Sequence, residues 1–228
     1  MKTLLVALSH PDDEVGCAGT IAAHRAAGHR VVLLWLTRGE MTEALGRLDP
    51  EEVGRRRMAH GEAVAKLLDC EPLFMEFPDT RVEATVEAAH RVARAIAEIE
   101  PDAVITWGNA WRRGMRHPDH QATGKIVRDA VTLARIARVV EPLAPHRADV
   151  PVYTLREPPS LLPEAAVDVS DYREEVLAVA RFYRERVGWP DEAWLVGRLE
   201  AVGRRWGVAA AESFDAWETE GGLRRLLV

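Results

Sequence analysis

Short apolar runs alternate with longer segments of helical periodicity through the first 140 residues of the chain. A continuous apolar run suits a parallel strand that is covered on both faces, and apolar residues at i, i+3 and i+4 indicate a helix. The expected strands are residues 3–8, 31–36, 72–77 and 102–107, and the expected helices are residues 15–25, 50–68, 82–99 and 119–139. This alternation implies right-handed crossovers, so we expect an α/β fold with a Rossmann-like, doubly wound, mostly parallel sheet and helices on both faces.

The pattern is less regular after residue 140, where the chain becomes rich in proline. We expect a strand over residues 152–155, a short strand over 167–171, a helix from Ser170 to about Val187 and a helix from Pro190 toward Ala211. The sequence contains no low-complexity tract and no convincing linker. We therefore expect a single domain of residues 1–228, in which residues 1–140 form the Rossmann-like core and residues 141–228 wall its site.

Composition and charge narrow the range of partners. The chain has 228 residues with 47% hydrophobic positions, ample for a core, and a net charge of −6 argues against a general binder of nucleic acid. Two cysteines, Cys17 and Cys70, favour a reducing compartment over a disulfide framework. No segment approaches the ~20 apolar residues that span a bilayer, and the apolar start is too short for a signal peptide. We expect a cytoplasmic protein without membrane or nucleic-acid partners, and these features are compatible with a homo-oligomer.

A cluster of histidine and acidic residues, His10-Pro11-Asp12-Asp13-Glu14, follows the first expected strand and opens the first expected helix. In an open α/β sheet, ligands bind at the carboxyl ends of the strands, and histidine with carboxylates is a composition for metal binding and acid–base chemistry. Proline at the first helical position and acids in the first turn also suit a helix without any chemistry. That explanation leaves His10 unaccounted for.

A second cluster, His117-Pro118-Asp119-His120, follows the run at residues 103–107 and opens another expected helix. Two such clusters, each after a strand and each before a helix, are hard to explain by packing alone. Together they provide His10, Asp13 and His120 as metal ligands, with acids and another histidine to spare. The remaining histidines have no clustered partners, and we interpret them as structural or solvated: His24, His29, His60, His90 and His146. No dinucleotide-binding, P-loop or nucleophile-elbow motif is found.

Both clusters resemble those of the PIG-L/LmbE-like zinc-dependent N-deacetylases. The resemblance includes Gly16 and Gly19-Thr20, extends through Thr37–Glu40 and Phe77–Asp79, and covers roughly residues 3–130. Further on, Arg205-Trp206-Gly207 and Ala211-Glu212-Ser213-Phe214 resemble the C-terminal part of the bacillithiol-type members. The resemblance implies one Zn²⁺ per chain, or another divalent metal, and hydrolysis of the N-acetyl group of a small amino-sugar conjugate such as N-acetylglucosaminyl-malate.

The roles of the residues follow from the resemblance and from the ligand inventory. A catalytic zinc usually has three protein ligands and an open position for water, whose pKa it lowers to about 7. His10, Asp13 and His120 fill the three positions, and the resemblance assigns Asp12 as the general base. His117 is left to stabilise the oxyanion or to protonate the leaving amine, and Asp119 would orient it.

The loop before the second cluster departs from the family and carries Arg112, Arg113 and Arg116 where members are often acidic or rich in glycine. A guanidinium is a planar fork suited to carboxylate or phosphate, so this loop would bind an anionic aglycone, with Arg57 as a further candidate. The alternative is a solvated basic loop. Residues 182–186 also differ from the family pattern, so the resemblance does not determine the identity of the substrate.

Two other functions remain compatible with these residues. The first is a metal-dependent carbohydrate-binding or regulatory protein without turnover, although the chain keeps Asp12, His117 and Asp119 beyond what metal binding needs. The second is a zinc-dependent amidase acting on another N-acyl or thiol conjugate, because one metal site serves either reaction.

Overall fold

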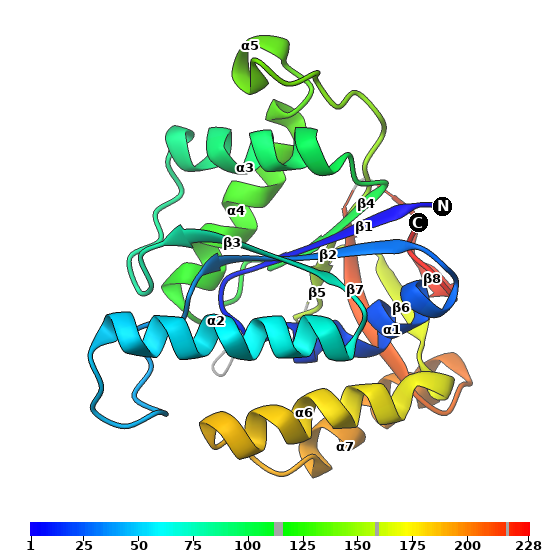
Figure 1. The fold of residues 1–228 in the computed structure, drawn as a ribbon. Coiled ribbons are helices and arrows are strands. Elements are labelled where there is room, and N and C mark those ends of the chain that lie inside the picture. Colours follow the sequence, from blue (N-terminus) through cyan, green and yellow to red (C-terminus); the bar gives the residue numbers. More distant parts are fainter. Residues whose placement is uncertain (112–115, 158–159, 218) are drawn as a thin grey trace.

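The computed structural model describes residues 1–111, 116–157, 160–217 and 219–228. One eight-stranded sheet forms its centre, in the order β3-β2-β1-β4-β5-β7-β6-β8 (Figure 1). The strands are β1 (Thr3–Leu8), β2 (Arg30–Thr37), β3 (Glu71–Phe77), β4 (Ala103–Thr106), β5 (Val152–Leu155), β6 (Glu164–Asp168), β7 (Ala211–Trp217) and β8 (Gly222–Arg224). The helices are α1 (Ala18–Ala26), α2 (Pro50–Leu67), α3 (Val86–Ile99), α4 (Pro118–Leu133), α5 (Ala137–Val140), α6 (Arg173–Val187) and α7 (Ala193–Trp206), with 3₁₀ turns η1 (Asp13–Cys17) and η2 (Ser170–Tyr172).

The first five strands are all parallel, and their order reverses beside β1. From β1 the chain moves outward through β2 to β3, and then returns to add β4 and β5 on the other side of β1. The carboxyl ends of β1 and β4 therefore form the topological switch point, where open α/β sheets bind ligands. The two histidine clusters follow these two strands, so the order of strands brings the clusters together.

Helices cover both faces of the sheet (Figure 1). Successive side chains of a strand point to opposite faces, and β1 accordingly divides its apolar residues between two cores. Leu4, Val6 and Leu8 pack with residues of α1, α2, α6 and α7, whereas Leu5 and Ala7 pack with residues of α3, α4 and α5. The predicted α/β fold, mostly parallel with helices on both faces, is confirmed.

Helix boundaries deviate from the predicted ones where a local cap decides them. The helix expected from residue 82 begins at Val86, because the Thr85 hydroxyl accepts a hydrogen bond from the Ala88 N–H and caps α3. The segment expected as one helix over residues 119–139 is divided into α4 and α5. Within the described residues, no helix is both long and apolar enough to cross a membrane.

The prediction was wrong after Trp206. The helix expected to run toward Ala211 ends at Trp206, where Gly207 takes a φ of 74°, and β7 follows it. This strand was missed because Glu212, Ser213 and Asp215 interrupt its apolar pattern, although all three are buried. Partners distant in the sequence satisfy them: Glu212, for instance, accepts hydrogen bonds from the N–H groups of Gly19 and Thr20 in α1.

Candidate metal and catalytic site

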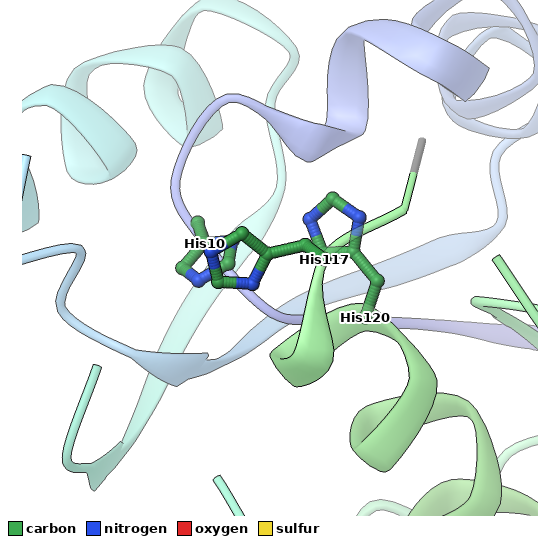
Figure 2. Close-up of side chains that lie close together, drawn as sticks. All are labelled: His10, His117 and His120. Atoms are coloured by element: carbon green, nitrogen blue, oxygen red, sulfur yellow. The ribbon is translucent and has the colours of Figure 1, made fainter. Parts of the chain in front are cut away.

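Three imidazoles meet at the switch point. Figure 2 shows His10, which follows β1, beside His117 and His120 at the start of α4. Their ring centroids are 4.9 to 5.3 Å apart, and one nitrogen of each lies within 4.8 Å of the others. Three imidazoles at this spacing offer nitrogen ligands to a single metal ion.

Asp13 lies between two of these histidines. Its Oδ1 is 3.3 Å from His120 Nε2, and its Oδ2 is 3.8 Å from His10 Nδ1. The N–H groups of Ser9 and His10 and the indole Nε1 of Trp107 also donate to Oδ2, at 2.9 to 3.0 Å. Although burial alone would raise the pKa of Asp13, the neighbouring His120 and His10 hold it well below its ordinary value. The carboxylate is thus fixed and ionised, as a metal ligand must be.

The spacing of Asp13 and His120 fits two ligands of one tetrahedral ion. Ligand arms of about 2.0–2.1 Å place two neighbouring donor atoms of a tetrahedral zinc site roughly 3.3–3.4 Å apart. Asp13 Oδ1 and His120 Nε2 are 3.3 Å apart, whereas the 3.8 Å separation of His10 Nδ1 is from the other oxygen of Asp13, Oδ2. The indole of Trp107 stacks on the His120 ring at 3.8 Å with an interplanar angle of 9°, which fixes the orientation of that ring.

His10 also faces two carboxylates on its other side. Its Nε2 is 3.1 Å from Asp79 Oδ1 and 3.2 Å from Asp119 Oδ2. Burial alone would lower the pKa of His10, but its hydrogen bonds with Asp119, Asp13 and Asp79 raise it well above the ordinary value. Asp79 was not among the predicted site residues. Its position directly after β3, another parallel strand, was a signal that sequence reasoning could have used.

The pair His117 and Asp119 has a geometry different from the one expected. His117 caps α4, because its Nδ1 accepts a hydrogen bond from the Asp119 N–H at 3.2 Å. The fully buried Asp119 carboxylate is 4.0 Å from that nitrogen, and it instead contacts His10 and accepts from the N–H groups of Thr80 and Val82. Asp119 therefore connects His10 to the loop after β3, and its predicted action on His117 stays a prediction.

Asp12 is held in an unusual conformation. Its φ is 125°, a value that side-chain-bearing residues rarely adopt. Arg57 Nη2 donates to Asp12 Oδ2 at 2.8 Å and also to the carbonyl oxygen of Pro11, and the Asp12 N–H donates to Glu14 Oε2 at 2.9 Å. Burial raises the pKa of Asp12, and the Arg57 charge opposes that rise.

Glu14 holds the turn at Asp12 in place through hydrogen bonds. It is fully buried and accepts hydrogen bonds from Trp35 Nε1 and from the Tyr183 hydroxyl, in addition to the Asp12 N–H. Burial raises its pKa to about 7. Sequence reasoning interpreted Glu14 only as a first-turn acid, since Tyr183 is 169 positions away along the chain.

A cavity of about 480 Å³ opens over the site, within the usual range of small-molecule sites of about 300–1,000 Å³. His10, Asp12, Asp13, His117, His120 and Arg57 line it, together with Trp189, Trp194 and Arg198 from the C-terminal portion, which were not predicted. Arg57 is engaged with Asp12, and Arg116 is exposed and not among the residues lining the cavity. Arg112 and Arg113 lie outside the described residues.

Comparison with known proteins agrees with this geometry. The PIG-L family model, described as GlcNAc-PI de-N-acetylase, matches residues 5–131. A 1D-myo-inositol 2-acetamido-2-deoxy-alpha-D-glucopyranoside deacetylase of Nakamurella multipartita is 29% identical over 73% of this chain and 68% of its own length. A probable N-acetyl-alpha-D-glucosaminyl L-malate deacetylase 2 of Bacillus anthracis is 27% identical over 57% of this chain and 59% of its own length.

Solved structures share the fold over nearly the whole chain. N,N'-diacetylchitobiose deacetylase from Pyrococcus horikoshii has a TM-score of 0.82 at 24% identity and covers 95% of this chain and 84% of its own. GalB, a 4-carboxy-2-hydroxymuconate hydratase, has a TM-score of 0.79 at 19% identity, covering 96% and 98%. At these identities the likeness concerns the fold, which supports more than one chemistry. The family match over more than half of the sequence shows that this chain belongs to the PIG-L family of N-deacetylases, hydrolases of the N-acetyl amide.

Proposed function

We propose that the protein is a zinc-dependent hydrolase that removes the N-acetyl group from an N-acetylglucosamine-type amino-sugar conjugate. The observation that carries this proposal is the position of Asp12. Its buried carboxylate lines the same cavity as His10, Asp13 and His120, while Arg57 holds it in place. A metal-binding set with an additional carboxylate at its side is what hydrolysis by an activated water requires.

His10, Asp13 and His120 would hold one Zn²⁺ per chain, or another divalent ion. When bound, the metal lowers the pKa of a water to about 7 and polarises the acetyl carbonyl. Asp13 suits a ligand role because three N–H donors occupy its Oδ2, which leaves Oδ1 directed toward His120. Asp79 and Asp119 hold His10 from the other side and orient its ring.

Asp12 acts as the general base and accepts the proton of the attacking water. Its burial disfavours the charged form and so raises its basicity, whereas Arg57 keeps the carboxylate ionised and oriented. The unusual φ of Asp12 directs its side chain into the cavity, and Glu14 fixes the backbone of the same residue. Two neighbours from different helices thus maintain one conformation of the base.

His117 stabilises the oxyanion and protonates the leaving amine. Its Nδ1 accepts the hydrogen bond of the helix cap, so the neutral ring carries its proton on Nε2. This neutral ring can donate to the oxyanion, whereas only the imidazolium form, in which Nδ1 also carries a proton and gives up the helix cap, protonates the leaving amine; burial and the charge of His10 lower the pKa of this form, so it releases its proton readily. Asp119 contributes by fixing the start of α4, on which His117 and His120 lie.

The partner of this site is a small amino-sugar conjugate, as the names of the relatives indicate. A cytoplasmic location is supported by two cysteines that form no disulfide, one of them fully buried. The assignment of residues 1–228 to a single domain, with a core over 1–140 and a walling portion over 141–228, and the expected homo-oligomer stay predictions.

Release of a free amine by zinc-loaded protein tests the proposal. The panel contains N-acetylglucosamine, its glycosides with inositol and malate, and an N-acyl thiol conjugate, and acetate is measured in parallel with the amine. We expect both products in equal amounts, loss of activity on chelation, and its return with Zn²⁺. Asp12→Asn is the matched control, and turnover that survives this substitution would contradict the assigned mechanism. Metal-loaded wild type that releases no amine from any member would contradict the function.

A further inference from the structure

The cavity over the candidate site is lined by two unlike groups of residues. Asp12, Asp13 and Asp79 follow the carboxyl ends of strands. Trp189, Trp194 and Arg198 come from α7 and the segment before it. The first group is rich in carboxylates, and the second combines two aromatic rings with a guanidinium.

Arg198 is available to a ligand in a way that neighbouring arginines are not. Three arginines of α6 and α7 pair with glutamates: Arg173 with Glu200, Arg184 with Glu192 and Arg205 with Glu164. Among the described residues, Arg198 makes no hydrogen bond and no ion pair, although it is half-buried in the cavity wall. Burial raises the pKa of the Glu212 carboxyl, and the charge of Arg198 opposes that rise from a distance. The donors of Arg198 are thus unused by any residue that the structure describes.

The two tryptophans form an apolar wall beside this guanidinium. Their ring centroids lie 5.9 Å apart with an interplanar angle of 48°, and Trp189 is in turn 6.1 Å from the Tyr183 ring. Trp194 remains 41% exposed. Rigid aromatic faces with one charged group at the side can hold an apolar ring face and direct its charged substituent.

Electrostatics then set the orientation of a substrate. At the strand ends the charges of Asp12, Asp13 and Asp79 are opposed by Arg57 and by the metal that the proposed function requires, whereas Arg198 has no such partner among the described residues. An anionic substituent is therefore best held at Arg198, whose planar fork matches a carboxylate or phosphate. The relatives differ in this respect, since one is named for an inositol conjugate, which is uncharged, and another for an L-malate conjugate, which is anionic.

We propose that Arg198, with Trp189 and Trp194, forms the aglycone subsite of this enzyme and selects an amino-sugar conjugate whose aglycone carries a carboxylate or phosphate. This inference rests on the proposed deacetylase function. It adds a candidate to the arginines of the loop before His117, whose expected binding of the anion stays a prediction. Arg198 escaped that expectation because it lies 78 positions after His120, within an amphipathic helix.

The test compares kcat/KM for N-acetylglucosaminyl-malate and for the N-acetylglucosaminyl-inositol conjugate. Arg198→Gln should lower the value for the malate conjugate about 10- to 100-fold and leave that for the inositol conjugate within about twofold. Arg198→Lys should lower kcat/KM for the malate conjugate less than Arg198→Gln does, because the lysine ammonium keeps the positive charge. Arg204→Gln is the matched control, because Arg204 lies on the same helix, is exposed and does not line the cavity.

Binding separates this inference from the proposed function. In the Asp12→Asn background, the Kd values of the malate and the inositol conjugates are measured by calorimetry with and without Arg198→Gln, and the melting temperature is recorded for each variant. A selective rise in Kd supports the subsite even if no conjugate is turned over, which would instead contradict the deacetylase function. Equal effects on both conjugates, or none on either, would overturn the subsite.

Discussion

The Arg57 guanidinium lies 2.8 Å from the Asp12 carboxylate, and the nitrogen that makes this contact also donates to the Pro11 carbonyl oxygen. Arg57 is only 2% exposed, so it serves the neighbouring acid rather than the solvent. One side chain from α2 thereby holds both the backbone and the carboxylate of the turn after β1. The arginine that we expected to bind substrate thus contacts the residue proposed as the base.

Replacing Arg57 with Gln should change the pH dependence of the reaction. The Arg57 charge lowers the pKa of Asp12 against the effect of burial, so its removal raises that pKa further. A base must be deprotonated, and the acidic limb of kcat/KM should therefore move to higher pH, with about a 10- to 100-fold loss near neutrality. Arg56→Gln is the control, because Arg56 is exposed and pairs with Glu52. An unmoved acidic limb would contradict the coupling.

Metal content should separate ligands from the base. His10→Ala, Asp13→Ala and His120→Ala should each lower zinc affinity by at least about 100-fold, since each would remove a direct ligand. Asp12→Asn should retain zinc and lose about 10²- to 10⁴-fold in rate. Elemental analysis of the purified variants, with kcat/KM measured at saturating zinc, gives both quantities. If the Asp12 variant lost zinc as completely as the other three, the distinction between metal ligands and general base would be wrong.

His117→Ala should flatten the alkaline limb of the pH profile. The acid must be protonated, and burial with the charge of His10 lowers the pKa of His117, so this limb falls at lower pH than an ordinary histidine would give. The rate should decrease by about 10²- to 10⁴-fold while zinc remains bound. Persistence of the same alkaline limb in the variant would assign it to another group and leave His117 only its role as the cap of α4.

Buried His24 should make the fold sensitive to mild acid. Its Nδ1 contacts the Thr20 carbonyl oxygen, its Nε2 accepts from the Leu227 N–H, and burial lowers its pKa to about 4. The unfolded chain takes up this proton near pH 6.5, so stability is intact above that pH and falls as the pH decreases toward 4, by about 3 kcal/mol in total. Urea unfolding at several pH values should show that the free energy of unfolding decreases less with falling pH in His24→Gln than in wild type. The decrease in His90→Gln should equal that of wild type.

Gly124 should not tolerate a side chain. A Cβ at this position of α4 would overlap the carbonyl oxygens of Trp107 and Gly108, the latter at 2.5 Å. Gly124→Ala should therefore cost about 1–3 kcal/mol of stability and displace the indole that holds Asp13. Gly197→Ala, in a helix with open space around it, should instead gain about 0.5–1 kcal/mol. Thermal unfolding and zinc affinity measure both effects.

The sequence was informative where local pattern decides the structure. The runs at residues 3–8 and 103–106 are strands because they are buried on both faces, and as parallel neighbours they place His10 and His117 at one edge of the sheet. The elements of the first 140 residues and the meeting of the two clusters were predictable for this reason.

Other features depend on partners that are distant along the chain. The contacts of Arg57 with Asp12 and of Tyr183 with Glu14 join residues 45 and 169 positions apart, which no periodicity reveals. The polar residues of β7 look unfit for a buried strand until their hydrogen-bond partners are known. Arg198 was missed in the same way, since only the folded chain places it at the cavity.

The position of β7 has a consequence for biosynthesis. This strand lies between β5 and β6, which precede it in the chain by more than 40 residues, and it pairs with both in antiparallel fashion. During translation β5 therefore leaves the ribosome with one open edge, and β6 has no neighbour until residues 211–217 appear. A chain interrupted before β7 would present the open edge of β5 together with an unpaired β6, a state prone to association with other nascent chains.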